Sequence, residues 1–387
     1  MSRLFLERCP RRHLVINVDI NKTIIQVDSA GGRTMEDVVN SNVAANVWGR
    51  PSCEGWTAVI GPGQPGDHSG LIAYDEYIDK KYAEPPGMHE LPRAEREQAW
   101  KQISEMRRSA VRIFTHDGQA GENYKRYVEQ QLAVLMAAPG CLIVPSFFEF
   151  INTLSEFNWS FTLLFRTFGN ELDSVLREWR DFVHGRHVYQ PRGEVLRRIR
   201  DTYVEEVTGC IFRDKDELFF CQGPDKAAVV TYPDGVETLL PEDIRTQLKQ
   251  LPSCTEVHQT NFATLHDQLL GYAGRSNGVA GIVDYYPYWA QQAERRCGGK
   301  VFPVLIQSPA APEEPPFYVF FDDNIFIGDD RSIVDLRDAR TGEELRGKEV
   351  EAKYTVRVNP YEAIVNNDYF VDCLAVMVKL QLMGPLE

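Results

Sequence analysis

The chain has 387 residues, of which 43% are hydrophobic, so it is long enough for two or three domains and can bury a large core. It carries 56 acidic and 42 basic residues, and the formal net charge of −14 argues against nucleic acid and anionic membranes as partners. The eight cysteines lie far apart and include no Cys-x-x-Cys pair, so we expect reduced, mostly buried thiols rather than a disulfide framework or a zinc site. Because no apolar run has the pattern of a signal peptide or the length of a membrane span, we expect a cytoplasmic location.

The first predicted element is a buried strand. Residues 13–20 form a nearly continuous apolar run with β-branched residues, which is typical of a strand buried on both faces of a parallel sheet. Residues 28–92 are rich in Gly, Pro and Asn and show little periodicity, so we expect an irregular insertion. Residues 93–137 carry apolar residues at helical spacing with charged faces between them, which predicts two amphipathic helices.

A second buried strand is predicted over residues 160–168, after a helix for which Ser146 is the candidate N-cap. Amphipathic helices follow at 171–183 and 193–207, and then a short β-rich patch that ends with a strand over 227–233. Helical spacing returns at 261–273. The apolar runs at 300–306 and 317–327 are interpreted as two further strands.

Strands and helices therefore alternate in three separate places, which predicts an α/β fold with a Rossmann-like parallel sheet and crossover helices. We assign this core to residues 10–27, 141–179 and 266–387. The two ranges between the core segments are expected to form inserted modules. Residues 28–140 should be mostly helical, and residues 180–265 should combine helices with the small β patch.

Polar side chains stand at the ends of the predicted core strands. Asp19, Thr167 and the pair Asp322–Asp323 each follow an apolar run, and Lys300 precedes one. Taken singly, each fits an ordinary turn, cap or solvated surface position. Ligands of open α/β sheets bind at the carboxyl ends of the strands, however, so these residues are expected to converge. Two adjacent carboxylates also repel each other unless a cation offsets them.

The order and spacing of these residues resemble the haloacid-dehalogenase-like superfamily. Its first motif, Asp-x-Asp-x-Thr after an apolar strand, is matched by Asp19-Ile20-Asn21-Lys22-Thr23. Its second, a strand that ends in Ser or Thr, is matched by Thr167. Its last, a strand that ends in two acidic residues, is matched by VFFDDN, and its lysine is matched by Lys300. Lys215 and Lys226 are alternative candidates for this lysine.

The resemblance implies a magnesium-dependent phosphohydrolase or phosphotransferase with a phosphorylated small-molecule substrate. Asp19 would attack phosphorus and form an aspartyl phosphate, and Thr167 and Lys300 would bind the phosphoryl oxygens. Mg²⁺ would be held by the residues Asp19, Asn21, Asp322 and Asp323. Further contacts to the substrate are expected from Thr23, Arg166 and Asn324. The resemblance also implies that both inserted modules are caps over the active site.

Asn21 departs from the family pattern, because the family has an aspartate there that protonates the leaving group. An asparagine keeps the backbone carbonyl for Mg²⁺ but cannot transfer a proton, and such an acid is worth roughly 10²–10⁴-fold in rate. Three alternatives follow: a slow or specialised hydrolase, with His116 or Asp117 as a substitute acid; a phosphotransferase; or a catalytically reduced protein that binds a ligand or a partner. In the hydrolase, Asn21→Asp is expected to raise the turnover of alkyl phosphates by up to roughly 10²-fold.

Overall fold

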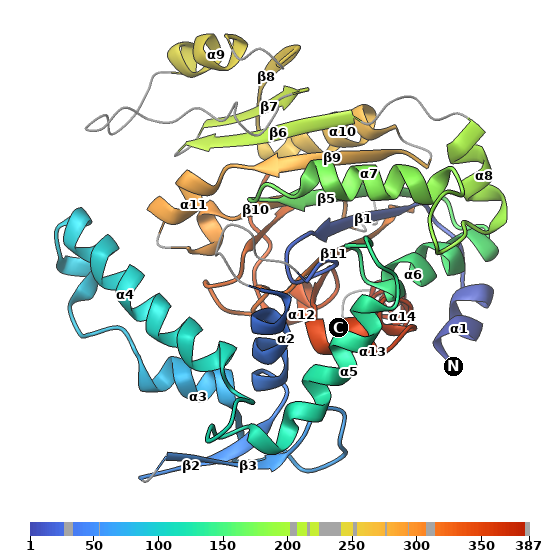
Figure 1. Ribbon diagram of the computed structural model, residues 1–387. Helices are drawn as coiled ribbons and strands as arrows, with labels where there is room; N and C mark the ends of the chain where they lie inside the picture. The colour runs from blue at the N-terminus through green and yellow to red at the C-terminus, as the bar shows by residue number, and fades with distance from the viewer. Residues whose placement is uncertain are drawn as a thin grey trace. The chain divides into compact units, whose positions relative to one another are not determined.

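The computed structural model describes residues 1–26, 34–53, 55–201, 207–214, 217–223, 241–250, 254–274, 277–292, 294–306 and 314–383 (Figure 1). The chain divides into two compact units. The first contains residues 1–25, 142–358 and 367–387, and the second contains residues 26–141 and 359–366. The strand expected over residues 227–233 lies outside the described residues.

The first unit is built on a mixed sheet with the strand order β13-β11-β1-β5-β9-β6-β7-β8 among its described residues. Its strands are β1 (Leu14–Asp19), β5 (Phe161–Thr167), β6 (Val207–Asp214), β7 (Glu217–Gln222), β8 (Glu256–Thr260), β9 (Val279–Asp284), β11 (Phe317–Asp322) and β13 (Thr355–Arg357). All pairings from β13 to β6 are parallel, and β6, β7 and β8 pair antiparallel. The predicted α/β class with a mostly parallel sheet is therefore confirmed.

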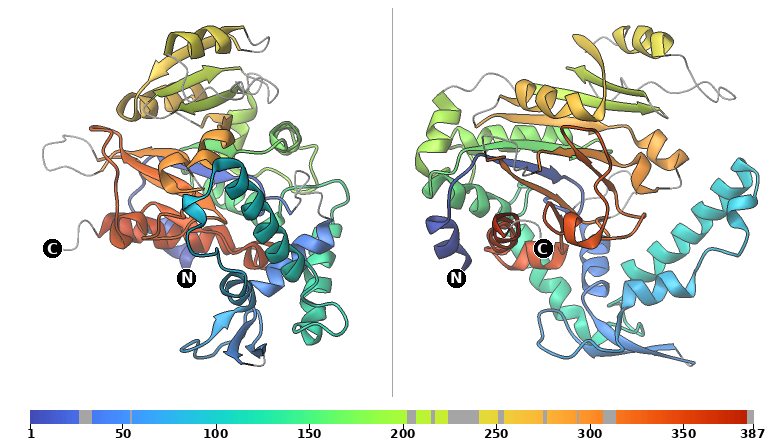
Figure 2. Two further views of the ribbon diagram at one scale, coloured as in Figure 1. Left: turned by 90° about the vertical axis from the view of Figure 1, so that its left-hand side faces the viewer. Right: turned by 180° about the vertical axis from the view of Figure 1, so that it is seen from behind.

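Helices cover both faces of this sheet, as expected for parallel strands that are buried on both sides. Helix α7 (Leu172–Val183) lies in front of the sheet in Figure 1. Helix α10 (Phe262–Ala273) lies on the opposite face, which the reverse view in Figure 2 shows. The unit also contains α1 (Ser2–Arg8), α6 (Pro145–Glu156), α8 (Gly193–Asp201), α9 (Pro241–Lys249), α11 (Tyr286–Gln291), α12 (Lys348–Glu351), α14 (Tyr369–Leu382) and the 3₁₀ turn η4 (Arg296–Gly298).

The central strands alternate their side chains between two cores. Towards one face, Phe321 contacts Phe150 of α6 and Phe370 of α14 through its ring. Towards the other, Phe320 packs on Phe302 of a second, parallel pair of strands, β10 (Lys300–Val304) and β12 (Val334–Asp338). Strand β10 thus lies against the face of the main sheet that carries Phe320.

The described residues of the range 180–265 do not form a module of their own, contrary to our expectation. Strand β6 pairs with β9, and β7 and β8 continue the main sheet from β6. The compact unit also runs without a break from residue 142 to residue 358. The alternating pattern of these strands gave no sign of whether they pair with one another alone or extend a larger sheet.

The second unit contains an antiparallel sheet that the irregular sequence of residues 28–92 did not indicate. In its described part, the sheet consists of β2 (Trp48–Ser52), β3 (Gly55–Ile60) and β4 (Ile72–Ala73). The helices are α2 (Met35–Ala44), α3 (Tyr74–Lys81), α4 (Arg93–Arg112), α5 (Lys125–Met136) and α13 (Pro360–Val365), with the 3₁₀ turns η1 (Met88–Glu90) and η2 (Glu122–Tyr124). Helix α13 joins this unit from near the end of the chain, where Asn359 and Asn46 exchange side-chain hydrogen bonds.

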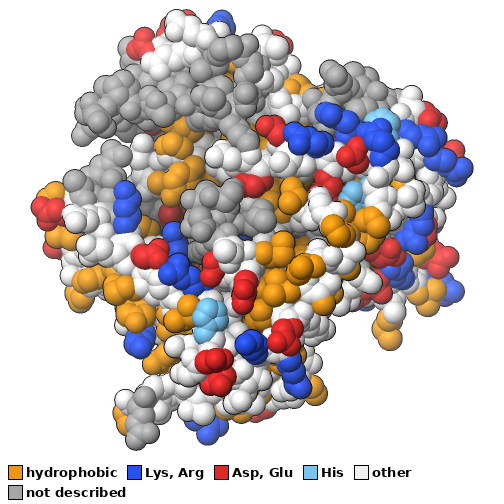
Figure 3. Space-filling model, in the orientation of Figure 1, with side chains coloured by type: hydrophobic (Ala, Val, Ile, Leu, Met, Phe, Trp, Pro, Cys, Tyr) orange, Lys and Arg blue, Asp and Glu red, His pale blue; other side chains and the backbone are white. Residues whose placement is uncertain are grey.

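The surface of the first unit has a local basic region. Figure 3 shows Lys and Arg side chains gathered over α7 and α8, although the whole chain carries a formal charge of −14. Within the described part of the chain, no helix combines the length and the apolarity needed to cross a membrane.

Candidate active site

The carboxyl ends of β1, β5 and β11 bring the expected residues to one edge of the main sheet. Val18 pairs with Phe321, so Asp19 and Asp322 are the next residues of two adjacent parallel strands. On the other side, Asp19 pairs with Arg166, the residue before Thr167. Asp19, Asp322 and Asp323 each offer a carboxylate oxygen, and these oxygens lie within 4.8 Å of one another.

Lys300 reaches this cluster from β10. Its ammonium contacts Asp19 Oδ1 and lies 2.8 Å from Asp322 Oδ2, and only 1% of its side chain is exposed. Burial alone would lower the pKa of Lys300, but the carboxylates of Asp19 and Asp322 raise it above the ordinary range of an amine. Lys300 therefore holds a positive charge between two carboxylates.

The carboxylate of Asp19 is held on both of its oxygens. Lys300 contacts Oδ1, and Thr23 Oγ1 donates a hydrogen bond of 3.1 Å to Oδ2. Burial raises the pKa of Asp19, the ammonium of Lys300 opposes that rise, and Asp322 and Asp323 add to it. Each carboxylate oxygen has two lone pairs, so both can accept a further ligand.

Thr23 has a different position from the one we expected. We predicted a contact to the substrate, but the hydroxyl of Thr23 contacts two other residues of the chain. Its hydroxyl donates to Asp19 and accepts a hydrogen bond of 3.2 Å from the backbone N–H of Asp323. Thr23 thus links the loop after β1 to the loop after β11 and orients Asp19.

Asp323 and Asn324 follow Asp322 at the end of β11 and complete the cluster of carboxylates. Burial, with a smaller contribution from Asp322, raises the pKa of Asp323 to about 6, and Lys22 opposes this rise. The backbone N–H of Asn324 donates to Asp322 Oδ1 at 2.8 Å, and its side-chain amide donates to Asp323 Oδ1 at 3.0 Å. Three clustered carboxylates are the oxygen ligands that Mg²⁺ prefers, so this donor set fits that cation.

The guanidinium of Arg166 binds other core residues and not the three aspartates, contrary to our expectation that it binds substrate. Arg166 is fully buried in β5, and its guanidinium makes a bidentate pair with Asp284 at 2.6 and 2.9 Å. It also donates to Asn17 Oδ1 at 2.9 Å and to the carbonyl of Val301 at 3.1 Å. Arg166 therefore joins β5 to three other strands of the core, β1, β9 and β10.

Asn21 has a side-chain partner that the sequence did not predict. Its side-chain Nδ2 donates a hydrogen bond of 3.0 Å to Glu171 Oε2, and Asn170 N donates to the same oxygen at 2.7 Å. Glu171 ends the turn that follows Thr167, and 8% of it is exposed. A glutamate in the polar turn after a core strand was the available sequence signal for this contact.

Thr167 and the turn that follows it lie beside the contact between Asn21 and Glu171. The hydroxyl of Thr167 accepts a hydrogen bond of 2.7 Å from the backbone N–H of Gly169. A Cβ atom on Gly169 would lie 2.3 Å from Glu171 Oε2, 2.7 Å from Asn21 Nδ2 and 3.3 Å from Thr167 Oγ1. Three polar side chains therefore converge beside Gly169.

The alternative candidates for the acid and for the lysine do not belong to the described cluster around Asp19. His116 and Asp117 lie exposed in the second unit, in the turn between α4 and η2. Lys215 and Lys226 lie outside the described residues.

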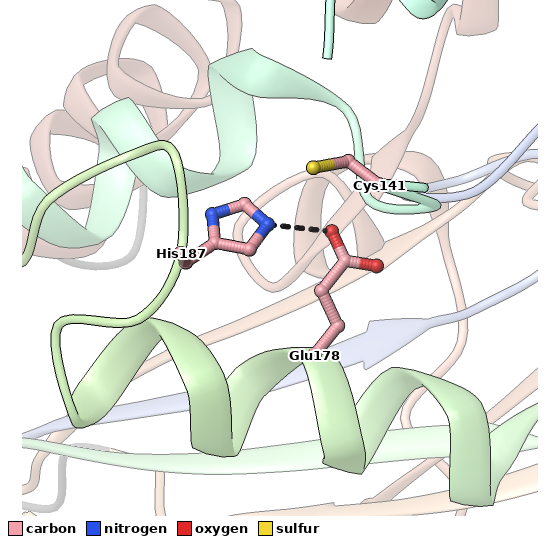
Figure 4. Close-up of side chains that lie close together, drawn as sticks. All are labelled: Cys141, Glu178 and His187. Atoms are coloured by element: carbon pink, nitrogen blue, oxygen red, sulfur yellow. Dashed lines mark hydrogen bonds and ion pairs between the residues drawn. The ribbon is translucent and has the colours of Figure 1, made fainter. Parts of the chain in front are cut away.

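A second polar pair in the first unit has a structural explanation. Figure 4 shows the side chains of Glu178, on α7, and His187 pointing towards each other. His187 Nδ1 accepts a hydrogen bond from Tyr189 N, so the hydrogen is on Nε2, which lies 3.0 Å from Glu178 Oε1. Glu178 Oε2 also accepts the N–H of Leu142 at 2.7 Å. The pair therefore anchors the start of the segment that leads into α6.

No family model matches this chain, and neither a curated protein nor a solved structure matches it.

Proposed function

We infer that the chain is a magnesium-dependent phosphohydrolase or phosphotransferase that acts on a phosphorylated small molecule, as its resemblance to the haloacid-dehalogenase-like superfamily implies. The observation that carries this proposal is the position of Asp19. Its carboxylate ends a buried strand in contact with the Lys300 ammonium, and Asp322 and Asp323 offer oxygens within 4.8 Å. A lone turn residue needs neither a buried lysine nor two further carboxylates.

The charges at this edge fit a phosphate group only when a cation joins them. Asp19, Asp322 and Asp323 together outweigh the single positive charge of Lys300, and a phosphate dianion would add to the repulsion. Mg²⁺ held by the three aspartates and the backbone carbonyl of Asn21 would neutralise this excess and polarise the phosphoryl group. The same cation would stabilise the cluster, because each of the three carboxylates would gain an opposite charge beside it.

The chain's own residues then have distinct roles. Asp19 attacks phosphorus with one carboxylate oxygen, while Thr23 holds the carboxylate in position through a hydrogen bond to Oδ2. Lys300 and the hydroxyl of Thr167 bind the phosphoryl oxygens. Water, or the hydroxyl of an acceptor molecule, next displaces Asp19 from phosphorus, which gives hydrolysis or transfer.

We assign the second unit to substrate selection. It is inserted directly after the loop that carries Asn21 and Thr23, which is one of the places where the family inserts a cap. Caps of this kind choose the substrate and exclude water from the reacting phosphoryl group.

The test compares the native chain with Asp19→Asn. We expect the native chain to release phosphate from acyl, aryl or alkyl phosphates in the presence of Mg²⁺ and to lose this activity with EDTA. Asp19→Asn should be inactive, and the exposed Asp201→Asn serves as the matched control. Mg²⁺ with beryllium fluoride should also raise the melting temperature of the native chain and not that of Asp19→Asn.

Asn21 supports one competing proposal, a catalytically reduced protein that only binds a phosphorylated ligand or a partner. In that case Mg²⁺ with phosphate would stabilise the native chain without phosphate release from any member of the panel. Absence of both stabilisation and release would remove the proposal altogether.

A further inference from the structure

Three of the eight cysteines gather where β6, β7 and β8 pair, although 44 positions (254 − 210) separate the first from the last. Cys210 and Cys221 are direct partners in the antiparallel pair of β6 and β7. Cys254 lies two residues before β8 begins, and its thiol and that of Cys221 are joined by a side-chain hydrogen bond. Cysteines that are distant in the sequence thus form a cluster of three thiols.

The backbone holds Cys221 and Cys254 close together. The carbonyl of Gln222, which follows Cys221, accepts hydrogen bonds from the backbone N–H of Thr255 at 3.0 Å and from its hydroxyl at 3.2 Å. Thr255 directly follows Cys254, whose thiol donates a weak hydrogen bond of 3.6 Å to the carbonyl of Glu256. Neighbouring strands lie about 4.8 Å apart and the Cα atoms of a disulfide about 4.4–6.8 Å apart, so a disulfide spans such a gap.

The two thiols differ in their access to solvent and in their acidity. Cys221 is fully buried, whereas Cys254 is partly exposed. Burial raises the pKa of both thiols, but the contact between them lowers the pKa of Cys254 and raises that of Cys221. The S–H group of Cys221 therefore favours a thiolate on Cys254, the member of the pair that a reagent in solution meets first.

We propose that Cys221 and Cys254 form a reversible disulfide, in which Cys254 attacks the oxidant and Cys221 resolves the mixed disulfide. Cys210 is not the resolving thiol, because the hydrogen bond of Cys254 is made to Cys221. The inference does not rest on the proposed function. In the sheet, β5, β9 and β6 lie between β7 and the strand that carries Asp19.

The oxidant is a low-molecular-weight disulfide, such as glutathione disulfide. The Cys254 thiol gives its proton to water, and its thiolate bonds to one sulfur of the reagent, whose S–S bond breaks and releases a thiolate. Cys221 then attacks the sulfur of Cys254, the mixed disulfide breaks, and the second thiolate leaves with the proton of Cys221. Two cysteine thiols are oxidised, and the reagent is reduced to two thiols.

The bond would fasten an edge strand to its neighbour. In the described part of the chain, β8 is the last strand on its side of the sheet, and it pairs with β7. An edge strand that detaches exposes the N–H and C=O groups of the next strand to other chains. A disulfide from the start of β8 to β7 prevents this opening under oxidising conditions.

The experiment treats the folded, full-length chain with glutathione disulfide at about pH 8, where thiolates form. Free thiols are then alkylated, and the chain is digested without reduction and mapped by mass spectrometry. We expect a peptide pair joined through Cys221 and Cys254, which dithiothreitol separates. The amides of β8 should exchange with deuterium at least about tenfold more slowly in the bridged chain than in the reduced chain.

The variants separate the two roles. Cys221→Ser should stop at the mixed disulfide of Cys254 with glutathione, and Cys254→Ser should leave Cys221 as a free thiol. Cys53→Ser, which removes an exposed cysteine of the second unit, is the matched control and should form the bridge like the native chain. Should Cys221→Ser fail to fold, as its melting temperature would reveal, Cys221→Ala takes its place.

The map of the native chain decides on its own. Glutathione on Cys254 beside a free Cys221 would overturn the proposal, and so would a bridge between Cys210 and Cys221. Free thiols at all three positions would also overturn it, provided that the exposed Cys297 has reacted with the reagent. Unchanged deuterium exchange in a bridged chain would overturn the effect on the edge strand.

Discussion

The ammonium of Lys300 lies 2.8 Å from the carboxylate of Asp322, and neither side chain is more than 1% exposed. The two residues begin β10 and end β11, so this ion pair joins the small sheet to the main sheet. A buried ion pair stabilises a fold only while both charges are present, because removal of one leaves the other without compensation.

Lys300→Met should therefore destabilise the chain by about 3–5 kcal/mol in EDTA, since Asp19 and Asp322 lose their shared cation. Mg²⁺ should restore part of this loss, because it supplies positive charge at the same carboxylates. Urea unfolding in EDTA and in Mg²⁺ measures both effects, with the exposed Lys101→Met as the control. A free energy of unfolding for Lys300→Met that is the same in EDTA and in Mg²⁺ would contradict this prediction.

Asn21→Asp alone should not give the gain in turnover that the sequence led us to expect. The new carboxylate would face that of Glu171 at the 3.0 Å contact now made by the amide, and two like charges repel at that distance. We expect a lower melting temperature at pH 7.5 for Asn21→Asp and its recovery when Glu171→Gln is added. A double-mutant cycle should give a coupling free energy of about 1 kcal/mol or more. Additive effects of the two substitutions would show that the two side chains do not interact.

His13 should make stability depend on pH. Burial lowers the pKa of His13 from 6.5, and its Nδ1 and Nε2 lie 2.6 Å and 2.9 Å from the hydroxyls of Ser160 and Thr162. The folded chain thus keeps this ring neutral, and below pH 6.5 the unfolded chain binds more protons than the folded one. Stability is fully present above pH 6.5 and decreases as the pH falls below it.

The measurement is the free energy of unfolding in urea at pH 7.5 and 5.5. His13→Gln should remove part of the loss in the free energy of unfolding that the native chain suffers between these two pH values. Identical losses in the native chain and the variant would show that His13 is not responsible.

Arg166 should matter for stability rather than for the binding of substrate. Arg166→Met leaves the carboxylate of Asp284 buried without its bidentate partner, at a cost of about 3–5 kcal/mol. Arg166→Met/Asp284→Asn should be less destabilised than the sum of the single variants, which urea unfolding can measure. If Arg166→Met raises KM without a loss of stability, the residue binds substrate, as the sequence first led us to expect.

The sequence predicted the parts of the site that have local signals. Asp19 and Asp322 end apolar runs of β-branched and aromatic residues, and such runs are typical of parallel strands that are buried on both faces. The contact of Asn21 could not be predicted from its neighbours in the sequence, because Glu171 lies 150 positions away and a glutamate in a polar turn does not specify its partner. Arg166 was misjudged because a polar residue in a strand has the same pattern whether it faces a ligand or a buried carboxylate.

The boundaries predicted for the second module, residues 180–265, differ from the structure for a related reason. Strand β6 pairs with β9, which follows it by more than sixty positions, and no feature within residues 207–214 specifies that neighbour. Pairing across such a distance is set by the packing of the whole sheet.

The position of β1 between β5 and β11 decides when this protein can finish folding during its synthesis. Leu14 is translated 303 positions before its neighbour Phe317 (317 − 14). One side of the first strand thus waits with unpaired N–H and C=O groups while the intervening residues emerge, which is the kind of long-range pairing that folds slowly. A nascent chain that stops before residue 317 lacks β11 and the aspartates that follow it. One side of β1 then stays unpaired, and such an open strand edge can pair with other chains unless a chaperone shields it.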